Sequence, residues 1–263
     1  MDKIKFQIPC LQAGDSTQNF RRLSGFLFIL FPILVQIPFG MLVAQFDYPE
    51  ILRESPAAIL TRFAQGGSAL ISVWYAYALS IGVFIAAVMA YDRSLKAPFL
   101  INRIGLASAA IQLVALLRWT FLVPFLARDY ANTTDTVARQ SIETLFSIQH
   151  NFLGIGLGEH VGQLTMAVWT VLVVHQSRQS VLLRSLGYLS ALLLTVGLSE
   201  HLAVVFGFDA GIFAQGAMIG FILWSVWLMG FGITLLRHSP PIPVDVSAEA
   251  AHSKIEIGFH TSN

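Results

Sequence analysis

Charged residues are scarce in this 263-residue chain: Asp, Glu, Lys and Arg make up 12% of it, against about 25% in typical soluble domains. Hydrophobic residues make up 55%, which is more than a soluble core of this length could hide from water. The formal net charge is +1. The chain therefore lacks the excess of positive charge that is typical of nucleic-acid-binding proteins. The composition therefore predicts an integral membrane protein whose main partner is the lipid bilayer, and no nucleic-acid partner.

Cysteine and catalytic motifs are also scarce. Cys10 is the only cysteine, so no internal disulfide can form and folding does not depend on an oxidising compartment. The first residues lack the cleavage site of a secretory signal, and the apolar run from about Leu23 is too long for one, so we interpret it as a retained anchor. The sequence contains no phosphate-binding glycine loop, nucleophile elbow or zinc-finger spacing, and therefore no motif that defines a reaction or a cofactor.

Long apolar runs, in contrast, are abundant. A helix needs about 20 apolar residues to cross about 30 Å of hydrocarbon, and six stretches of the sequence are long enough. They are Leu23–Phe46, Ser68–Ala90, Arg103–Leu126, Phe152–Val174, Leu186–Phe208 and Ile212–Leu236. The predicted fold class is therefore all-α, a polytopic bundle of six transmembrane helices. Residues 21–237 are expected to form this domain, between a cytoplasmic N-terminal segment (residues 1–20) and a disordered cytoplasmic tail (residues 238–263).

The distribution of lysine and arginine predicts the orientation of the bundle. One side would carry ten of these residues: Lys3, Lys5, Arg21, Arg22, Arg93, Lys96, Arg178, Arg184, Arg237 and Lys254. The other side would carry four: Arg53, Arg62, Arg128 and Arg139. Because cytoplasmic loops hold the excess of positive residues, both termini are predicted to be cytoplasmic.

A layer of charged and ionisable residues inside the predicted spans is the sharpest functional signal. Its members are Arg118, Glu159, His160, Glu200 and His201. Such groups are costly in a membrane, so they usually face protein or a water-filled cavity and often mark function. Arg118, Glu159 and Glu200 lie seven or eight residues from the outer ends of their spans, so three helices place charge at a similar depth. Gln163, one turn from Glu159, extends the polar face.

A short repeat joins two of these spans. Residues 156–160, Gly-Leu-Gly-Glu-His, recur as Gly-Leu-Ser-Glu-His at residues 197–201. Because the two predicted helices run in opposite directions, the copies would be related by a pseudo-two-fold axis in the membrane plane, as are inverted elements around transporter sites. The small residues would allow the helices to approach closely. Glu159 could then pair with His201, and Glu200 with His160, while Arg118 balances a carboxylate.

The leading hypothesis for this layer is a proton-linked carrier or small-ligand site formed by Arg118, Glu159, His160, Gln163, Glu200 and His201. Carboxylate–histidine pairs in a medium of low dielectric constant can exchange protons at physiological pH. An arginine can clamp an anionic substrate. Six helices are few for a monomeric carrier, so this hypothesis favours a homo-oligomer.

Three other interpretations stay open. A metal-dependent membrane enzyme could bind zinc or iron through His160, His201, Glu159 and Glu200, with His150 and Glu143 above them. The geometry of a helix argues against this metal site. Adjacent Glu and His residues on one helix point about 100° apart, so a single ion would have to take its ligands mainly from different helices. Haem could be held by His160 and His201 as axial ligands. The last interpretation is a purely structural layer of polar contacts between helices. Interhelical hydrogen bonds in membranes average well under 1 kcal/mol, so stability alone is a weak reason to bury these groups.

Several short motifs in the first half of the chain carry a family resemblance. They are Arg22-Leu23-Ser24-Gly25-Phe26-Leu27-Phe28, Tyr48-Pro49, Arg62-Phe63, Gly66-Gly67 and Trp74-Tyr75. With these motifs the chain resembles a bacterial family of short membrane proteins of about six helices, known as a domain of unknown function. The resemblance implies a setting in the bacterial cytoplasmic (inner) membrane, and it implies no activity and no site residues.

Overall fold

The computed structural model describes residues 13–94, 99–208 and 211–237, and within these ranges it leaves out the side chains of residues 13–15, 99, 201, 204, 211, 212 and 214. The described residues form helices and contain no strand, which confirms the all-α fold class. The predicted tail, residues 238–263, lies outside them. The predicted N-terminal segment lies partly outside them, and its residues 13–20 are the first turns of a long helix.

Eleven helical segments follow one another along the described chain. The first five are α1 (Ala13–Phe46), the 3₁₀ helix η1 (Glu50–Arg53), α2 (Pro56–Ser94), α3 (Phe99–Phe121) and α4 (Val123–Asn132). The next three are α5 (Thr136–Gln149), the π-helix η2 (His150–Val161) and α6 (Gly162–Gln176), which form one continuous rod. The last three are α7 (Val181–Gly197), α8 (Ser199–Phe206) and α9 (Gly211–Arg237).

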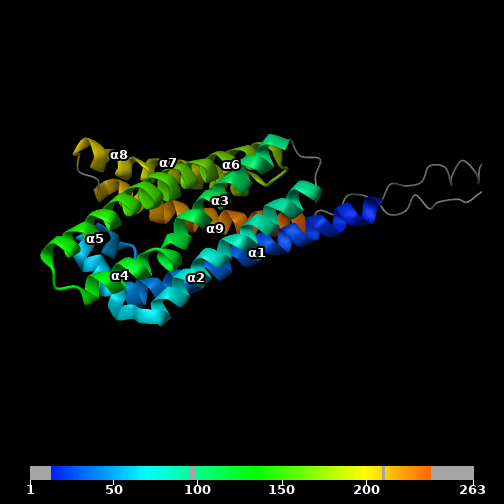
Figure 1. Ribbon diagram of the computed structural model, residues 1–263. Coiled ribbons are helices and arrows are strands. Elements are labelled where there is room, and N and C mark those ends of the chain that lie inside the picture. The colour runs from blue at the N-terminus through cyan, green and yellow to red at the C-terminus, as the bar shows by residue number, and fades with distance from the viewer. Residues whose placement is uncertain (1–12, 95–98, 209–210, 238–263) are drawn as a thin grey trace, which may run out of the picture.

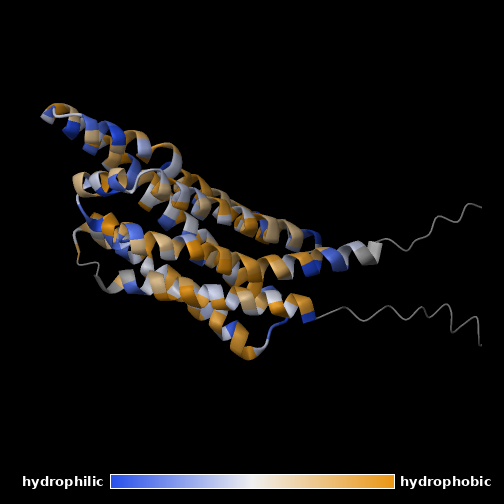
Figure 2. Ribbon diagram, turned by 90° about the horizontal axis from the view of Figure 1, so that it is seen from below, coloured by the Kyte–Doolittle hydropathy of each residue, from blue (hydrophilic) through white to orange (hydrophobic). Residues whose placement is uncertain are grey.

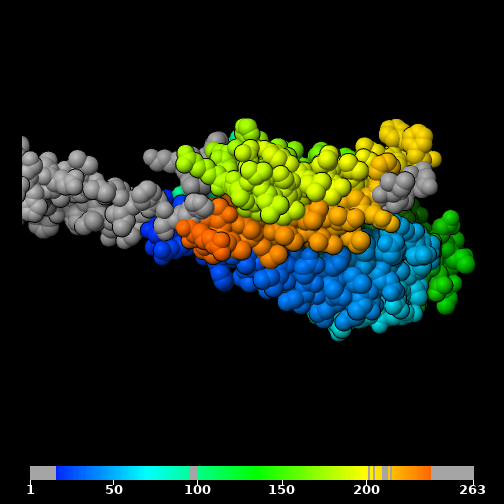
Figure 3. Space-filling view, turned by 180° about the vertical axis from the view of Figure 1, so that it is seen from behind, coloured from blue at the N-terminus to red at the C-terminus, as the bar shows by residue number. Residues whose placement is uncertain are grey.

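The long helices form a closed ring. α1 packs against α2, α2 against α3, α3 against α6, α6 against α7, α7 against α9, and α9 against α1. On the face shown in Figure 3, α9 fills the space between α1 and α7 and so closes the ring. α4, α5 and α8 gather at one end of the bundle, whereas α1 begins and α9 ends at the other (Figure 1). We call the end with α4, α5 and α8 the outer end, following the predicted orientation.

Five helical stretches are long and apolar enough to cross a membrane, so the chain is a multi-pass membrane protein. They are Ser16–Phe46, Pro56–Ser94, Leu100–Asn132, Thr136–Gln176 and Gln215–Arg237. Hydrophobic residues run along the bundle, and hydrophilic residues gather toward its ends (Figure 2). The predicted span Leu186–Phe208 differs from the structure, because the chain divides there at Leu198 into the 17-residue α7 and the short α8. The count of six spans and the cytoplasmic side of the termini remain predictions.

Aromatic side chains form two clusters, one above the other. In the outer cluster the rings of Trp74 and Trp119 stack with their centroids 4.6 Å apart. In the inner cluster Phe84 meets Trp169 edge to face at 5.3 Å, and Trp224 donates its indole N–H to the Thr170 hydroxyl at 2.8 Å. The candidate site lies between these two clusters, so rigid aromatic packing holds it from both sides.

Candidate functional site

Arg118 is the buried centre of the site, with 7% of its surface exposed. Its Nη1 donates a hydrogen bond to the backbone carbonyl of Ala115 at 2.7 Å, and the guanidinium lies 5.2 Å from the centroid of the Trp119 ring. The other side of the guanidinium rests on η2, where a Cβ added to Gly154 would lie 2.7 Å from Cζ. The Arg118 Nε has no hydrogen-bond partner within the described part of the chain. The cation therefore has unused hydrogen-bonding capacity in a position closed to bulk water.

The π-helix η2 brings the other half of the site against α3. Glycines let the two backbones approach, because Gly158 faces Ala115, and a Cβ at Gly162 would lie 2.8 Å from the Gln112 side chain. The Ser108 hydroxyl donates to the Gly162 carbonyl at 2.8 Å and fixes this contact. π-Helices are rare and occur frequently at functional sites. A π-helical segment of 12 residues carrying Glu159 is therefore a structural sign of function, independent of the charges.

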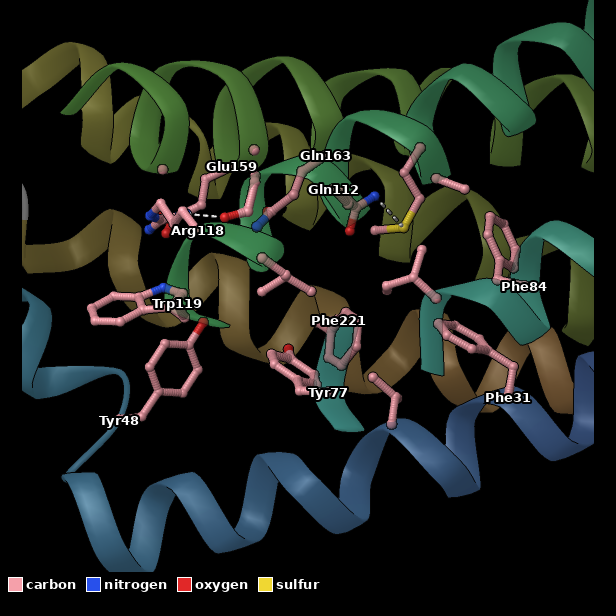
Figure 4. Close-up of a pocket in the computed structure, with 18 of the residues that line it drawn as sticks. Phe31, Tyr48, Tyr77, Phe84, Gln112, Arg118, Trp119, Glu159, Gln163 and Phe221 are labelled. Carbon is pink, nitrogen blue, oxygen red and sulfur yellow. Dashed lines mark hydrogen bonds between the residues drawn. The ribbon is translucent and has the colours of Figure 1, made fainter. Parts of the chain in front are cut away.

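Glu159 lies beside Arg118, and the two charges interact (Figure 4). Both residues line an inner cavity of about 80 Å³. Near the pair the walls are polar, with the amides of Gln112 and Gln163 and the hydroxyls of Tyr48 and Tyr77. Farther inward the walls are apolar and include Phe31, Val35, Ile81, Phe84, Met166, Phe221 and Trp224. The cavity thus changes from polar to apolar along its length.

Tyr48 reaches this cavity from the turn after α1. Burial is the main cause that raises the pKa of its hydroxyl well above the ordinary value; nearby Tyr77 and Glu159 add to the rise, and Arg118 opposes it. The hydroxyl therefore stays protonated through the physiological pH range and acts as a neutral hydrogen-bond donor or acceptor. Any ligand beside Arg118 meets the charges of Arg118 and Glu159 and several neutral polar groups.

A second, larger cavity lies toward the outer end, and we call it the vestibule. It measures about 980 Å³ and is bounded by η1 and the start of α2, by α5 and η2, and by α8. Its ionisable lining residues are Arg53, Glu54, His150, Glu159, His160 and Glu200. Leu52 and Glu159 line both cavities. Glu159 therefore stands at the boundary between the buried arginine and the outer opening.

An ion pair crosses the vestibule from η1 to α8. Arg53 contacts the Glu200 carboxylate through Nη2 at 2.8 Å and Nε at 3.2 Å, and its Nη1 contacts Glu50 at 2.7 Å. Partial burial alone would lower the pKa of Arg53, but the hydrogen bonds and charges of Glu200 and Glu50 together raise it. Arg53 therefore keeps its charge throughout the physiological range and ties α8 to the first outer loop.

We expect Glu200→Gln to lower the free energy of unfolding by at most about 1 kcal/mol, because the Arg53 side chain is 44% exposed and water screens such pairs. Thermal unfolding in a mild detergent measures the loss. Asp47→Asn, which breaks the more exposed Arg62–Asp47 pair at 3.0 Å, is the matched control and should change less. A loss above about 2 kcal/mol for Glu200→Gln alone would contradict a screened pair.

The structure brings most of the predicted site residues together, but in two groups. Arg118, Glu159 and Gln163 line the inner cavity, and Glu159, His160 and Glu200 line the vestibule. The ion pair of Glu200 with Arg53 was not predicted. The His201 side chain lies outside the described side chains, and with it the predicted pairing of Glu159 with His201. The repeat at residues 156–160 and 197–201 has two different backbones, a π-helix in the first copy and the α7–α8 junction in the second.

The remaining predicted metal ligands lie at or beyond the vestibule. His150 is 6% exposed and stacks on Phe146 with the ring centroids 5.4 Å apart. The Leu52 carbonyl lies near its ring, but neither ring nitrogen makes a hydrogen bond of good geometry within the described chain. Glu143 lines neither cavity and accepts a hydrogen bond from the Tyr130 hydroxyl at 2.9 Å. Among the described side chains no three His, Cys, Asp or Glu residues converge as ligands, so the metal and haem hypotheses depend on His201.

Several site residues were not anticipated from the sequence. Gln112 lies inside a predicted span six residues before Arg118, so its polarity at that depth was a usable signal. Tyr48, Tyr77 and Trp119 carried no such signal, because aromatic residues are ordinary in membrane helices and at their ends. Arg53 was counted only for orientation.

The fold and the site together define the class of this molecule: a multi-pass helical membrane protein with a buried polar site between two aromatic clusters. Within that class, the chain belongs to the family described as "Domain of unknown function (DUF4386)", whose model matches residues 23–232. The resemblance in the N-terminal half is thereby confirmed, and the match continues through most of the C-terminal half. No curated protein and no solved structure matches the chain.

Proposed function

We propose that the protein binds a small anionic ligand at the Arg118–Glu159 pair and that binding is linked to protonation of Glu159. The observation that carries the proposal is the position of Glu159, which lines both the inner cavity shared with Arg118 and the vestibule. An ionisable pair inside a membrane is by default a candidate for function. A pair that lies between an inner cavity and an outer opening can also meet a ligand.

The lining of the inner cavity supports binding of an anion. Ligand sites are concave and mostly apolar, with a few convergent polar groups that fix orientation, and the inner cavity has this composition. Arg118 has an unpaired Nε, and a guanidinium suits the planar, two-point recognition of carboxylate or phosphate. Gln163 and the neutral Tyr48 hydroxyl can donate further hydrogen bonds. The Gln112 amide nitrogen already donates to the Ser108 hydroxyl at 3.0 Å and to the Gly162 carbonyl at 3.4 Å.

Proton linkage follows from the charges around Glu159. Arg118 faces it from α3, Tyr48 and Tyr77 from α1–η1 and α2, and His150 and His160 lie on η2 itself. An anion bound to Arg118 would put a second negative charge beside the Glu159 carboxylate. Two like charges that share one site favour protonation of one of them, so binding is expected to take up a proton.

The proposed setting is the bacterial cytoplasmic membrane, with six spans of which α7 and α8 together form the fifth. The described basic residues support cytoplasmic termini, since six of the twelve lie at the end where α1 begins and α9 ends, against four at the outer end. The six are Arg21, Arg22, Arg93, Arg178, Arg184 and Arg237, and the four are Arg53, Arg62, Arg128 and Arg139. A homo-oligomer would suit a carrier of so few helices.

A panel of small anions tests this proposal. Inorganic phosphate, benzoate and succinate are added to purified protein, and the melting temperature and tryptophan fluorescence are followed, because Trp119 lies beside Arg118. At least one anion should stabilise the wild type and fail to stabilise Arg118→Gln. Arg128→Gln is the control, because Arg128 is exposed and lies against Phe125 and Asp129 of its own helix, away from the residues that line the inner cavity.

A second variant separates the two parts of the proposal. Glu159→Gln should still bind the anion but should no longer take up a proton, which a pH indicator in weakly buffered solution measures. If no anion distinguishes the wild type from Arg118→Gln, the binding proposal is wrong. If Glu159→Gln takes up the proton as the wild type does, the linkage is wrong.

A further inference from the structure

The vestibule has one polar and one apolar wall. Its polar lining includes Arg53, Glu200 and His160. Its apolar lining includes Ile155 of η2 with Leu202 and Val205 of α8, and we call these three residues the apolar wall. Leu202 is 47% exposed and Val205 is 78% exposed. A vestibule that only admitted water and ions would have no use for this apolar wall, since each exposed aliphatic side chain is unfavourable in water.

α8 packs only lightly on each of its neighbours α7, α9 and η2, whereas α6 and α7 pack closely on each other. We call the boundary between η2 and α8 the seam. Large apolar side chains flank the seam on the outside: Phe152 of η2 is 69% exposed and Phe206 of α8 is 69% exposed. Side chains of this kind face lipid in a membrane protein.

The two cavities differ greatly in size. A single water needs about 10–15 Å³ of such volume, so the inner cavity of about 80 Å³ has room for a headgroup of a few atoms beside Arg118. The vestibule, at about 980 Å³, has room for an aliphatic chain. Leu52 and Glu159 line both, so the two cavities adjoin at these side chains.

We infer that the ligand is a single-chain amphiphile with an anionic head, which enters from the outer leaflet through the seam between η2 and α8. Its head reaches Arg118 past Glu159, and its chain lies in the vestibule along Ile155, Leu202 and Val205. This inference rests on the proposed anion site and adds the chemical class of the ligand and its route of entry.

The test compares ligands that differ in aliphatic chain or in headgroup charge. They are added to protein reconstituted into phosphatidylcholine nanodiscs. The probes are laurate, dodecylamine with the same chain and the opposite charge, and benzoate as an anion without a chain. Tryptophan fluorescence reports binding. Laurate should bind the wild type at least ten-fold more tightly than either comparison ligand, and Arg118→Gln should lose this preference.

Two glycine variants test whether the aliphatic chain lies in the vestibule. Gly156 lines the vestibule, and an added Cβ would meet the Asn151 backbone carbonyl at 3.3 Å, a tight contact that requires a small local shift. Gly156→Leu should therefore weaken laurate binding at least ten-fold and leave benzoate binding unchanged. Gly82→Leu, on α2 with nothing within 4 Å of its added Cβ, should change neither.

Each other outcome has a distinct meaning. If benzoate binds through Arg118 but laurate binds no more tightly, the amphiphile inference is overturned and the anion site stands. If laurate binds equally well to Arg118→Gln and Gly156→Leu, it binds elsewhere and the inference also fails. If neither anion distinguishes the wild type from Arg118→Gln, the proposed function fails together with the inference.

Discussion

Replacing Glu159 by glutamine is expected to destabilise the protein by about 1–3 kcal/mol, because Arg118 is buried and loses the counter-charge beside it, while the partial exposure of Glu159 reduces the effect below that of a fully buried pair. Arg118 is 7% exposed and is held between Trp119 and Gly154, so its guanidinium cannot move out to water. Removing both charges should restore part of the loss, since an apolar replacement of a buried pair is often neutral. The double variant Arg118→Met/Glu159→Gln is therefore expected to be more stable than Glu159→Gln alone.

Reversible unfolding in mixed micelles measures the stability of the wild type, of the two single variants and of the double variant. Asp129→Asn is the control: its carboxylate lies 3.7 Å from Arg128 in a pair that is well exposed on both sides, so its loss should be close to zero. An added anion that binds Arg118 should also recover stability in Glu159→Gln. Strictly additive effects of the two single substitutions would show that the pair is not coupled and would argue against the buried site.

The second large effect is expected from Gly158→Ala. A Cβ at Gly158 would collide with the Cβ of Ala115, so η2 must move away from α3 and the contact that positions Glu159 is lost. Overpacking of this kind typically costs about 1–3 kcal/mol. It should also abolish the response to anions, because Arg118 and Glu159 would no longer lie side by side. Thermal unfolding and the anion titration report the two effects.

The control for this substitution is Gly82→Ala, where an added Cβ meets nothing within 4 Å. Alanine is favoured over glycine in a helix by about 0.5–1 kcal/mol, so Gly82→Ala should leave the protein unchanged or slightly more stable. If Gly158→Ala behaved like Gly82→Ala, the close approach of η2 and α3 would be refuted.

Most of the fold was predictable from hydropathy, because a backbone in lipid must satisfy its own hydrogen bonds and does so as a helix. Five predicted spans overlap the long apolar helices of the structure. The predicted span Leu186–Phe208 instead divides at Leu198, near Glu200. The partner of Glu200 is Arg53, which is 147 residues away in the sequence. No local sequence pattern can show a contact between residues so far apart. Hydropathy alone therefore predicted one helix that continued past Leu198.

For the site, the sequence could predict only how deep its residues lie in the membrane. Counting residues from the ends of the spans placed Arg118 and Glu159 at one level, and the structure has them side by side. The π-helical conformation of η2 left no sign in the sequence beyond closely spaced glycines, which are equally typical of ordinary helix packing. Tyr48 comes from a turn whose path depends on the packing of the whole ring.

The order of synthesis gives the contact between α3 and η2 a consequence for membrane insertion. Arg118 leaves the ribosome 41 residues ahead of Glu159, and an arginine near the centre of an isolated span costs about 2.5–3.5 kcal/mol on insertion. Until the next span follows, α3 carries this cost with no counter-charge. We therefore expect the third span to wait beside the insertion machinery and to enter the bilayer together with the η2–α6 span, as one hairpin whose charges are already matched.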